Sequence, residues 1–219
     1  MLRSYENEIR AVAERIAEAD RQTRHMIGSV VAREEKYTEI FRTKIEDQLN
    51  GFSDGGISWK VFTYTTDKQS GQERKVGADL VIAMHIDLEG VGIDKGVLVQ
   101  SKINKNVRHG ISVDSRARLN SQCRQMKVHS QAAYVFAYGN QSTKVITADG
   151  VLTGASLSDL QSKSVGEFFG DVMMCWAGDT NIVATDYRSL ETLVKEMEAA
   201  AGIAISGVCV GDHARAQID

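Results

Sequence analysis

The spacing of apolar residues changes along this chain, and that change constrains the fold more than any other feature. In the first fifty residues apolar side chains recur every three or four positions, which is typical of amphipathic helices. Between residues 57 and 102, β-branched and aromatic residues instead form strand-like runs separated by turns that contain glycine. Helical spacing returns near residue 115, and a compact apolar run follows it. This order predicts an α/β sandwich around a mixed sheet.

The first helical region covers residues 1–25. Its apolar positions form one stripe, made of Leu2, Tyr5, Ile9, Val12, Ile16 and Ala19. The stripe is shorter than the roughly three to four heptads that indicate a coiled coil. We therefore expect this added N-terminal amphipathic helix to pack on its own domain, residues 26–219. Dimerisation through the same stripe is the alternative.

A second helical stretch runs from about residue 26 to residue 49. It ends at Asn50-Gly51, because Asn and Gly accept the left-handed conformation found past helix ends. Its apolar stripe contains Glu34, and Glu35 lies at the edge of that stripe. A carboxylate on a buried face costs free energy unless a partner compensates it. We therefore expect Glu34 to meet a metal ion or a cation.

The rest of the chain alternates between strand and helix signals. In chain order, the expected elements are strands at 57–66, 75–88 and 97–102, a helix at 115–130, a strand at 132–138, and helices at 156–161, 165–176 and 187–201. Turns are expected at residues 67–71 and 90–96, where glycine and polar residues interrupt the apolar pattern.

Length and composition describe one globular domain. The 219 residues are 42% apolar, and no apolar run approaches the roughly 18 to 20 residues that cross a membrane. The N-terminus lacks the apolar core of an export signal, so we expect a cytoplasmic protein with no membrane partner. Cys123, Cys175 and Cys209 lie far apart without a CxxC pair, which argues against a disulfide framework or a zinc site.

Positive charge is concentrated between residues 101 and 130, although the whole chain has a formal net charge of −3. That segment holds one acid, Asp114, and the basic residues Lys102, Lys105, Arg108, Arg116, Arg118, Arg124 and Lys127. A local basic face suits the phosphate backbone of a nucleic acid. The residues predicted to contact nucleic acid are Lys105, Arg108, Arg116, Arg124 and Lys127. A solvated helix and loop is the alternative reading of the same charges.

The segment with the clearest chemistry is VGADLVI at residues 76–82, followed by GVLVQSK at residues 96–102. Gln100 and Lys102 are two positions apart on one strand and point to the same face, because strand side chains alternate. If the two strands pair as a hairpin, Asp79 lies beside them at one end of the sheet. A carboxylate, an amide oxygen and an ammonium then converge, and a helix glutamate can add a fourth group. Oxygen ligands suit Mg²⁺, and a lysine can orient a water molecule.

These residues resemble the core of the PD-(D/E)XK nuclease superfamily over about residues 26–138. The matched positions are Asp79 in GAD, Gln100 and Lys102 in QSK, Glu34 or Glu35 in REEKYTEIF, and, as an auxiliary catalytic residue, Gln122 in LNSQCRQM. The resemblance implies a restriction-endonuclease-like α/β/α sandwich. Gln100 stands where Asp or Glu is commoner, which removes a negative charge and predicts weaker metal binding.

The resemblance implies a Mg²⁺-dependent endonuclease that hydrolyses DNA as an effector in prokaryotic anti-phage defence, with Mn²⁺ as an alternative ion. Its implied metal ligands are Asp79, Gln100, the Ser101 carbonyl and Glu34 or Glu35, while Lys102 positions the attacking water. One alternative is a catalytically silent subunit of the same fold that binds nucleic acid or a partner protein. Another is a toxin-like ribonuclease. The acidic C-terminal third is a candidate surface for a protein partner or a homo-oligomer.

Overall fold

The computed structural model describes residues 2–27, 33–66, 76–88, 91–103 and 113–210. The helices are a short 3₁₀ helix η1 (Leu2–Tyr5), α1 (Glu6–Ile27), α2 (Glu34–Leu49), α3 (Val113–His129), α4 (Ala148–Leu152), α5 (Val165–Met173) and α6 (Tyr187–Glu196). The strands are β1 (Ser53–Asp54), β2 (Ile57–Thr65), β3 (Leu80–Leu88), β4 (Val91–Ile103), β5 (Ala133–Tyr138), β6 (Thr143–Thr147) and β7 (Ala201–Cys209). Within these ranges the strands form one sheet in the order β1-β2-β7-β3-β4-β5-β6.

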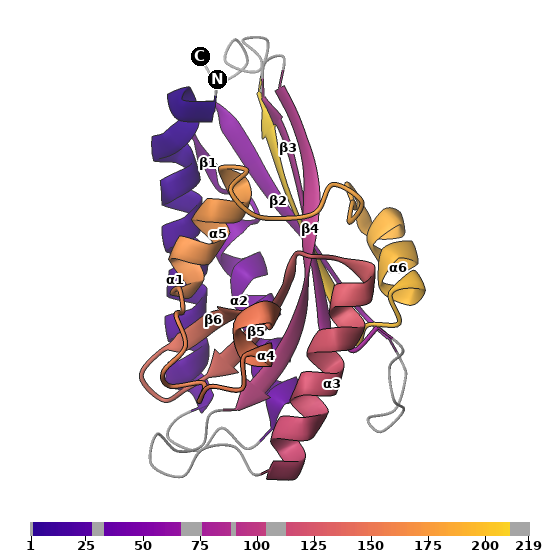
Figure 1. Ribbon diagram of the computed structural model, residues 1–219. Coiled ribbons are helices and arrows are strands. Elements are labelled where there is room, and N and C mark those ends of the chain that lie inside the picture. Colours follow the sequence, from indigo (N-terminus) through magenta and orange to yellow (C-terminus); the bar gives the residue numbers. More distant parts are fainter. Residues whose placement is uncertain (1, 28–32, 67–75, 89–90, 104–112, 211–219) are drawn as a thin grey trace.

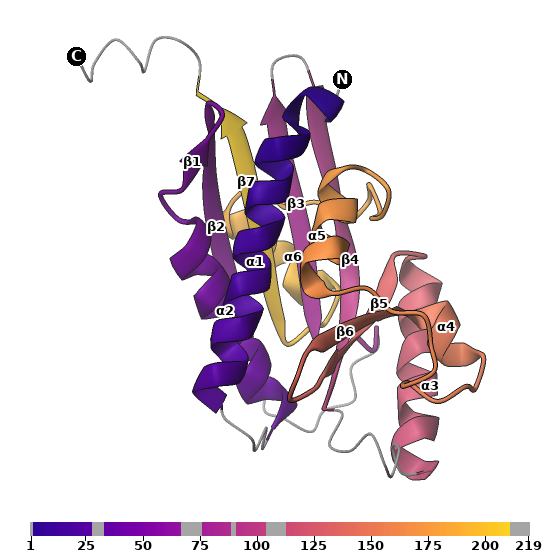
Figure 2. The same ribbon diagram turned by 90° about the vertical axis from the view of Figure 1, so that its left-hand side faces the viewer.

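The sheet lies between two layers of helices (Figures 1 and 2). One buried cluster joins α1, α2 and α5 to the sheet and includes Ile16, Phe41 and Phe169. The other joins α3, α4 and α6 to the opposite face and includes Leu119 and Leu190. The predicted α/β sandwich around a mixed sheet is therefore confirmed. In the described part of the chain, no helix is both long enough and apolar enough to span a membrane.

The N-terminal helix α1 belongs to the first of these layers. Its Ile9, Val12 and Ile16 are buried in the cluster shared with α2 and α5. At the contact with α5, a Cβ added to Gly166 would lie 3.2 Å from the Cβ of Ala17. Small residues therefore allow α1 and α5 to approach closely, and α1 covers the sheet together with α2.

The elements around the predicted site lie close to their expected positions. The strand expected at 57–66 is β2, the helix at 115–130 is α3 and the strand at 132–138 is β5. β5 runs parallel to β4, so α3 is the crossover that joins them. The second helix begins at Glu34 rather than near residue 26, because Met26 and Ile27 still belong to α1. The turn expected at 67–71 lies outside the described residues.

β3 and β4 form a long antiparallel hairpin that is paired along all of β3. The turn expected at residues 90–96 is therefore wrong from Val91 on, where β4 begins. Gly96 serves packing rather than a turn, because an added Cβ would lie 2.4 Å from the Ile182 side chain. Gly96 also exchanges backbone hydrogen bonds with Asp179. The strand expected from residue 75 begins only at Leu80.

The C-terminal third differs most from the expected elements. The helix expected at 187–201 ends at Glu196, and β7 follows it in the middle of the sheet. β7 is an apolar run buried on both faces, and such a run has no period that separates strand from helix. No helix forms at 156–161, where Ser156 and Ser158 bond to each other and Ser158 to Asp159. β6 and α4 have no counterpart among the expected elements.

Candidate functional site

Asp79 lies at the entry to β3, opposite Gln100 when the register of the β3–β4 hairpin is continued by one residue. Its backbone N–H donates to the Val99 carbonyl at 2.9 Å, and its carbonyl accepts the Ala201 N–H at 3.1 Å. Its carboxylate Oδ2 accepts the Ser101 N–H at 3.0 Å and a hydrogen bond from the Gln100 amide nitrogen. Contacts with β4 and with the start of β7 therefore determine where this carboxylate lies.

Gln100 is buried in β4, with only 2% of its surface exposed. Its Nε2 donates to Asp79 Oδ2 and to the Ser101 carbonyl, the latter at 3.2 Å. Its Oε1 is also buried and accepts no hydrogen bond from any described residue. A buried acceptor without a donor costs about 1–3 kcal/mol. The amide is thus satisfied at its nitrogen and unsatisfied at its oxygen.

Glu34 is the first residue of α2, and its carboxylate reaches the end of β4. Lys102 Nζ lies 3.3 Å from Glu34 Oε2 and 3.5 Å from Oε1, and the Ile103 N–H donates to Oε1 at 3.2 Å. The cationic partner expected for Glu34 is therefore Lys102 in this structure. The pair stands beside Asp79 and Gln100, because Lys102 follows Gln100 by two positions in the same strand.

Three buried hydroxyls join α2 to β4 and β5 at this end of the sheet. The Thr38, Ser101 and Tyr138 hydroxyl oxygens lie 3.0–3.1 Å apart, and Thr38 also donates to the Glu34 carbonyl at 3.1 Å. Burial raises the pKa of Tyr138, so its phenol remains protonated and can donate. This hydroxyl triangle holds the first turn of α2, and with it Glu34, against the strand that carries Ser101.

A second buried polar cluster joins α1 to α2 and β6. Asp20 accepts hydrogen bonds from the hydroxyls of Tyr37 at 2.7 Å and Thr143 at 2.6 Å, and it forms an ion pair with Arg24. Burial first, and then the charge of Asp20, raise the pKa of Tyr37. The Tyr37 ring stacks on the Tyr138 ring with centroids 3.9 Å apart. The Asp20 cluster and the hydroxyl triangle therefore meet at two stacked tyrosines.

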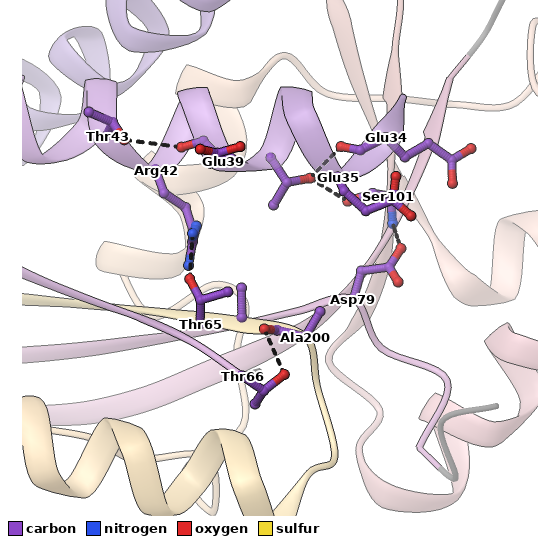
Figure 3. Close-up of a pocket in the computed structure, with 12 residues that line it drawn as sticks. Glu34, Glu35, Glu39, Arg42, Thr43, Thr65, Thr66, Asp79, Ser101 and Ala200 are labelled. Carbon is purple, nitrogen blue, oxygen red and sulfur yellow. Dashed lines mark hydrogen bonds between the residues drawn. The ribbon is translucent and has the colours of Figure 1, made fainter. Parts of the chain in front are cut away.

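A cavity of about 470 Å³, the α2 cavity, opens between α2 and the ends of neighbouring strands (Figure 3). Its lining combines carboxylates, hydroxyls and one guanidinium, and the residues that matter here are Glu34, Glu35, Thr38, Glu39, Arg42, Asp79 and Ser101. In Figure 3, Asp79 and Ser101 lie below the first turn of α2, which carries Glu34 and Glu35. The volume is within the range of small-ligand sites, about 300–1,000 Å³. The candidate site therefore has open space next to it.

Arg42 lies in the wall of the α2 cavity at the end away from Asp79 (Figure 3). Its guanidinium donates to the Tyr64 carbonyl at 2.7 Å and to the Thr65 hydroxyl at 2.8 Å. Burial lowers the pKa of this guanidinium, while the nearby carboxylate of Glu46 acts in the opposite direction. Arg42 therefore ties α2 to β2 and places a positive charge in a wall rich in carboxylates.

The residues of this site fit Mg²⁺ through mixed oxygen ligands rather than through carboxylates alone. In the ranges that the structure describes, no three His, Cys, Asp or Glu side chains are grouped so that they could hold a metal ion. Asp79 Oδ2 and the Ser101 carbonyl do converge, and both contact the Gln100 amide. The unpartnered Oε1 of that amide is a further oxygen of the kind that Mg²⁺ accepts. The fit therefore depends on which end of the amide faces Asp79.

Gln122, expected as an auxiliary residue, lies in α3 behind the segment that leads to Asp79. A Cβ added to Gly77 would lie 2.7 Å from the Gln122 backbone carbonyl, so α3 packs tightly on that segment. The Oε1 of Gln122 is buried without a hydrogen-bond partner among the described residues. The structure thus brings the Gln122 backbone next to Gly77, two positions before Asp79 in the chain.

The predicted nucleic-acid contacts fall into different environments. Arg116 donates to the Val151 and Ala155 carbonyls at 2.8 and 2.7 Å, and Lys127 forms an ion pair with Asp149. These two side chains therefore join α3 to α4 and its following loop. Arg124 is exposed on α3. The other two predicted contacts, Lys105 and Arg108, lie outside the described residues.

Sequence analysis did not identify the residues that position the site, namely Thr38, Tyr138, Arg42 and the Asp20 cluster. Thr38 belongs to the expected apolar stripe of α2, and Tyr138 closes the expected buried strand. Each looks like an ordinary core position in the sequence. Their roles depend on contacts among α2, β2, β4 and β5. No local sequence pattern predicts these contacts.

No protein-family model, no curated protein and no solved structure matches this chain. Similarity to a characterised protein therefore contributes nothing to a functional assignment.

Proposed function

We propose that the protein is a Mg²⁺-dependent endonuclease that hydrolyses DNA at the Asp79–Gln100–Lys102 centre. The observation that carries this proposal is the meeting of the Asp79 carboxylate, the Gln100 amide and the Ser101 carbonyl across two paired strands. The Lys102–Glu34 pair stands beside them. The order α2, β3–β4 hairpin, α3 and β5 supports the restriction-endonuclease-like core that the sequence resemblance implies.

The proposed ligands of the ion are Asp79, the Ser101 carbonyl, Gln100 and Glu34, with Glu35 as the alternative helix ligand. When bound, Mg²⁺ or Mn²⁺ lowers the pKa of a water molecule and offsets charge on the phosphate. Glu34 can serve as a ligand only by giving up its contact with Lys102. The released ammonium can then orient the water and stabilise negative charge that develops on the phosphate oxygens.

The choice of DNA rests on the charge of α3 and the segment before it. Arg124 is exposed and makes none of the α4 contacts of Arg116 and Lys127, so its guanidinium can meet a phosphate. A cytoplasmic role as an effector of anti-phage defence is part of the same proposal. That part rests on the family resemblance alone.

A second candidate is a catalytically silent subunit of the same fold that binds nucleic acid or a partner protein. Two observations favour it. The Asp79 and Glu34 carboxylates are both engaged by donors of the protein itself, and the neutral Gln100 replaces a possible third carboxylate. Fewer charged ligands mean a weaker hold on the ion.

The first test is incubation of the purified protein with supercoiled plasmid, linear duplex, single-stranded DNA and RNA, in Mg²⁺, Mn²⁺ or EDTA. We expect cleavage of DNA with either ion and none in EDTA. The Lys102→Met variant should lose cleavage by on the order of a hundredfold or more, because the methionine keeps the shape of the side chain without its charge. Cleavage of RNA alone would favour the ribonuclease alternative.

Lys163→Met is the matched control for this variant. Lys163 also pairs with a carboxylate, that of Asp171, but it lies beyond β6 on an exposed loop before α5 and does not line the α2 cavity. The Lys163→Met variant should cleave DNA at the wild-type rate. Equal rates for Lys102→Met and the wild type would contradict the mechanism, and nucleic-acid binding without cleavage would favour the silent subunit.

A further inference from the structure

The nitrogen and the oxygen of the Gln100 amide have different surroundings. Nε2 lies between two oxygens, Asp79 Oδ2 and the Ser101 carbonyl, and donates to both. Oε1 is buried and accepts nothing from the described residues. The amide nitrogen thus occupies a position between two protein oxygens, where a small cation would meet the same pair of ligands.

Rotation of the amide by half a turn about its last side-chain bond exchanges nitrogen and oxygen with almost no change of shape. Three oxygens would then face one another, those of Asp79, Ser101 and Gln100. Without a positive charge between them these oxygens repel, and the two hydrogen bonds of the observed orientation are lost. With a divalent cation between them, the same three oxygens form part of a coordination shell.

We infer that Gln100 is a two-position amide: its nitrogen closes the metal centre of the metal-free protein, and its oxygen becomes a ligand when Mg²⁺ binds. This inference rests on the metal centre of the proposed function and adds to it how that centre behaves without the ion. A glutamate at this position could not close the centre, because it would place a second carboxylate against Asp79. The neutral amide keeps the end of the hairpin paired before the ion arrives, and it lowers the affinity for the ion.

NMR of the ¹⁵N-labelled full chain tests the rotation directly. The side-chain amide signals of Gln100 can be identified by their absence from the spectrum of Gln100→Met. On titration with Mg²⁺, these signals should shift with the same midpoint as the thermal stabilisation of the protein. The signals of Gln131, which is exposed between α3 and β5, should stay in place.

Thermal unfolding of three variants tests the role of the oxygen. Without metal, Gln100→Glu should have a lower Tm than the wild type. It should bind Mg²⁺ about tenfold more tightly or better, so its Mg²⁺-induced rise in Tm should be larger than that of the wild type. Gln100→Met should lose the Mg²⁺-induced shift in Tm, because it offers neither donor nor ligand. Gln131→Glu adds the same charge at an exposed position and should keep the wild-type shift.

The outcomes separate this inference from the proposed nuclease activity. Gln100 signals that remain in place while Mg²⁺ stabilises the protein would overturn the inference and leave cleavage untouched. Gln100 signals that move with Mg²⁺ in a protein that cuts no nucleic acid would support the inference and remove the nuclease proposal. Failure of both Mg²⁺ and Mn²⁺ to stabilise the wild type and Gln100→Glu would overturn both.

Discussion

Two aspartates of this protein, the buried Asp20 and the partly buried Asp79, belong to polar clusters that the Tyr37–Tyr138 stack connects. Asp20 is matched by two hydroxyls and by the charge of Arg24. The Asp79 carboxylate accepts hydrogen bonds from the Gln100 amide and the Ser101 N–H, and Asp79 lines the α2 cavity. The oxygen of the Gln100 amide accepts no hydrogen bond from a described residue. A complete network stabilises a fold, whereas an incomplete one beside a cavity is suited to a ligand. We therefore expect Asp20 to contribute mainly to stability and Asp79 to the proposed site.

The largest effect is expected from Asp20→Asn, which keeps the shape of the side chain and removes its charge. The change leaves Arg24 without its buried partner and should lower the free energy of unfolding by about 3–5 kcal/mol. Urea unfolding measures this loss. Asp149→Asn is the control, because Asp149 is 68% exposed in its pair with Lys127 and should change stability by at most about 1 kcal/mol. Equal losses would mean that the Asp20 cluster is not special.

Asp79→Asn is the matched change at the other aspartate and should give the opposite profile. It should alter stability by only about 1 kcal/mol, because an asparagine oxygen can still accept the Ser101 N–H. It should also abolish the Mg²⁺-induced shift in Tm and reduce cleavage by on the order of a hundredfold. Thermal scans with and without Mg²⁺ give the first result and plasmid nicking the second. A large loss of stability with normal cleavage would reverse the roles assigned to the two aspartates.

The free energy of unfolding at alkaline pH should depend on Tyr37, which belongs to the Asp20 cluster. The ordinary pKa of tyrosine is 10.0, and burial together with Asp20 raises the pKa of Tyr37. Above about pH 10 the unfolded chain therefore loses a proton that the folded chain keeps, so stability is complete below that pH and falls as pH rises. The slope is about 1.4 kcal/mol per pH unit for each such group.

Tyr37→Phe should make this slope shallower by up to about 1.4 kcal/mol per pH unit in urea unfolding, because the phenylalanine does not titrate. The buried Tyr138, whose pKa is also raised, keeps its own contribution. An identical slope in Tyr37→Phe and in the wild type would contradict the raised pKa.

The smallest effect is expected from Tyr138→Phe, which tests whether the two clusters are coupled through the stacked rings. The variant keeps the ring and removes one hydroxyl of the triangle, so it should cost about 1 kcal/mol. Because Thr38 and Ser101 remain bonded to each other, cleavage should fall by less than it does in Asp79→Asn. Tyr64→Phe, at the far side of the sheet, is the control for loss of a tyrosine hydroxyl. Wild-type cleavage in Tyr138→Phe would show that the clusters act independently.

Much of the candidate site could be predicted from the sequence, because its core is one hairpin. Alternation along β4 places Gln100 and Lys102 on one side, and the apolar stripe of α2 predicts that the carboxylate of Glu34, which is partly buried in the structure, needs a partner. The identity of that partner could not be predicted. Lys102 comes from a strand that is far from Glu34 in the sequence, and only the packing of α2 on β4 brings the two charges within 3.3 Å.

The elements that were predicted wrongly from the sequence have a related cause. The helix expected at 187–201 overran into β7, and the turn expected at 90–96 proved to be paired strand, because both segments take their structure from distant neighbours. β7 is held between β2 and β3, and Gly96 is held against Asp179. Long-range pairing overrides local preference in such segments.

The sequence by itself determined the alternation of helices and strands, the α/β class, and the hairpin that places Asp79 opposite Gln100. These follow from periods of two and 3.6 residues, which are properties of the local chain. Only the tertiary structure decided that β7 enters the centre of the sheet, that Lys102 meets Glu34, and that the Gln100 amide turns its nitrogen towards Asp79. Each of these depends on the balance of hydrogen bonds and charges among segments far apart in the chain, which no local period encodes.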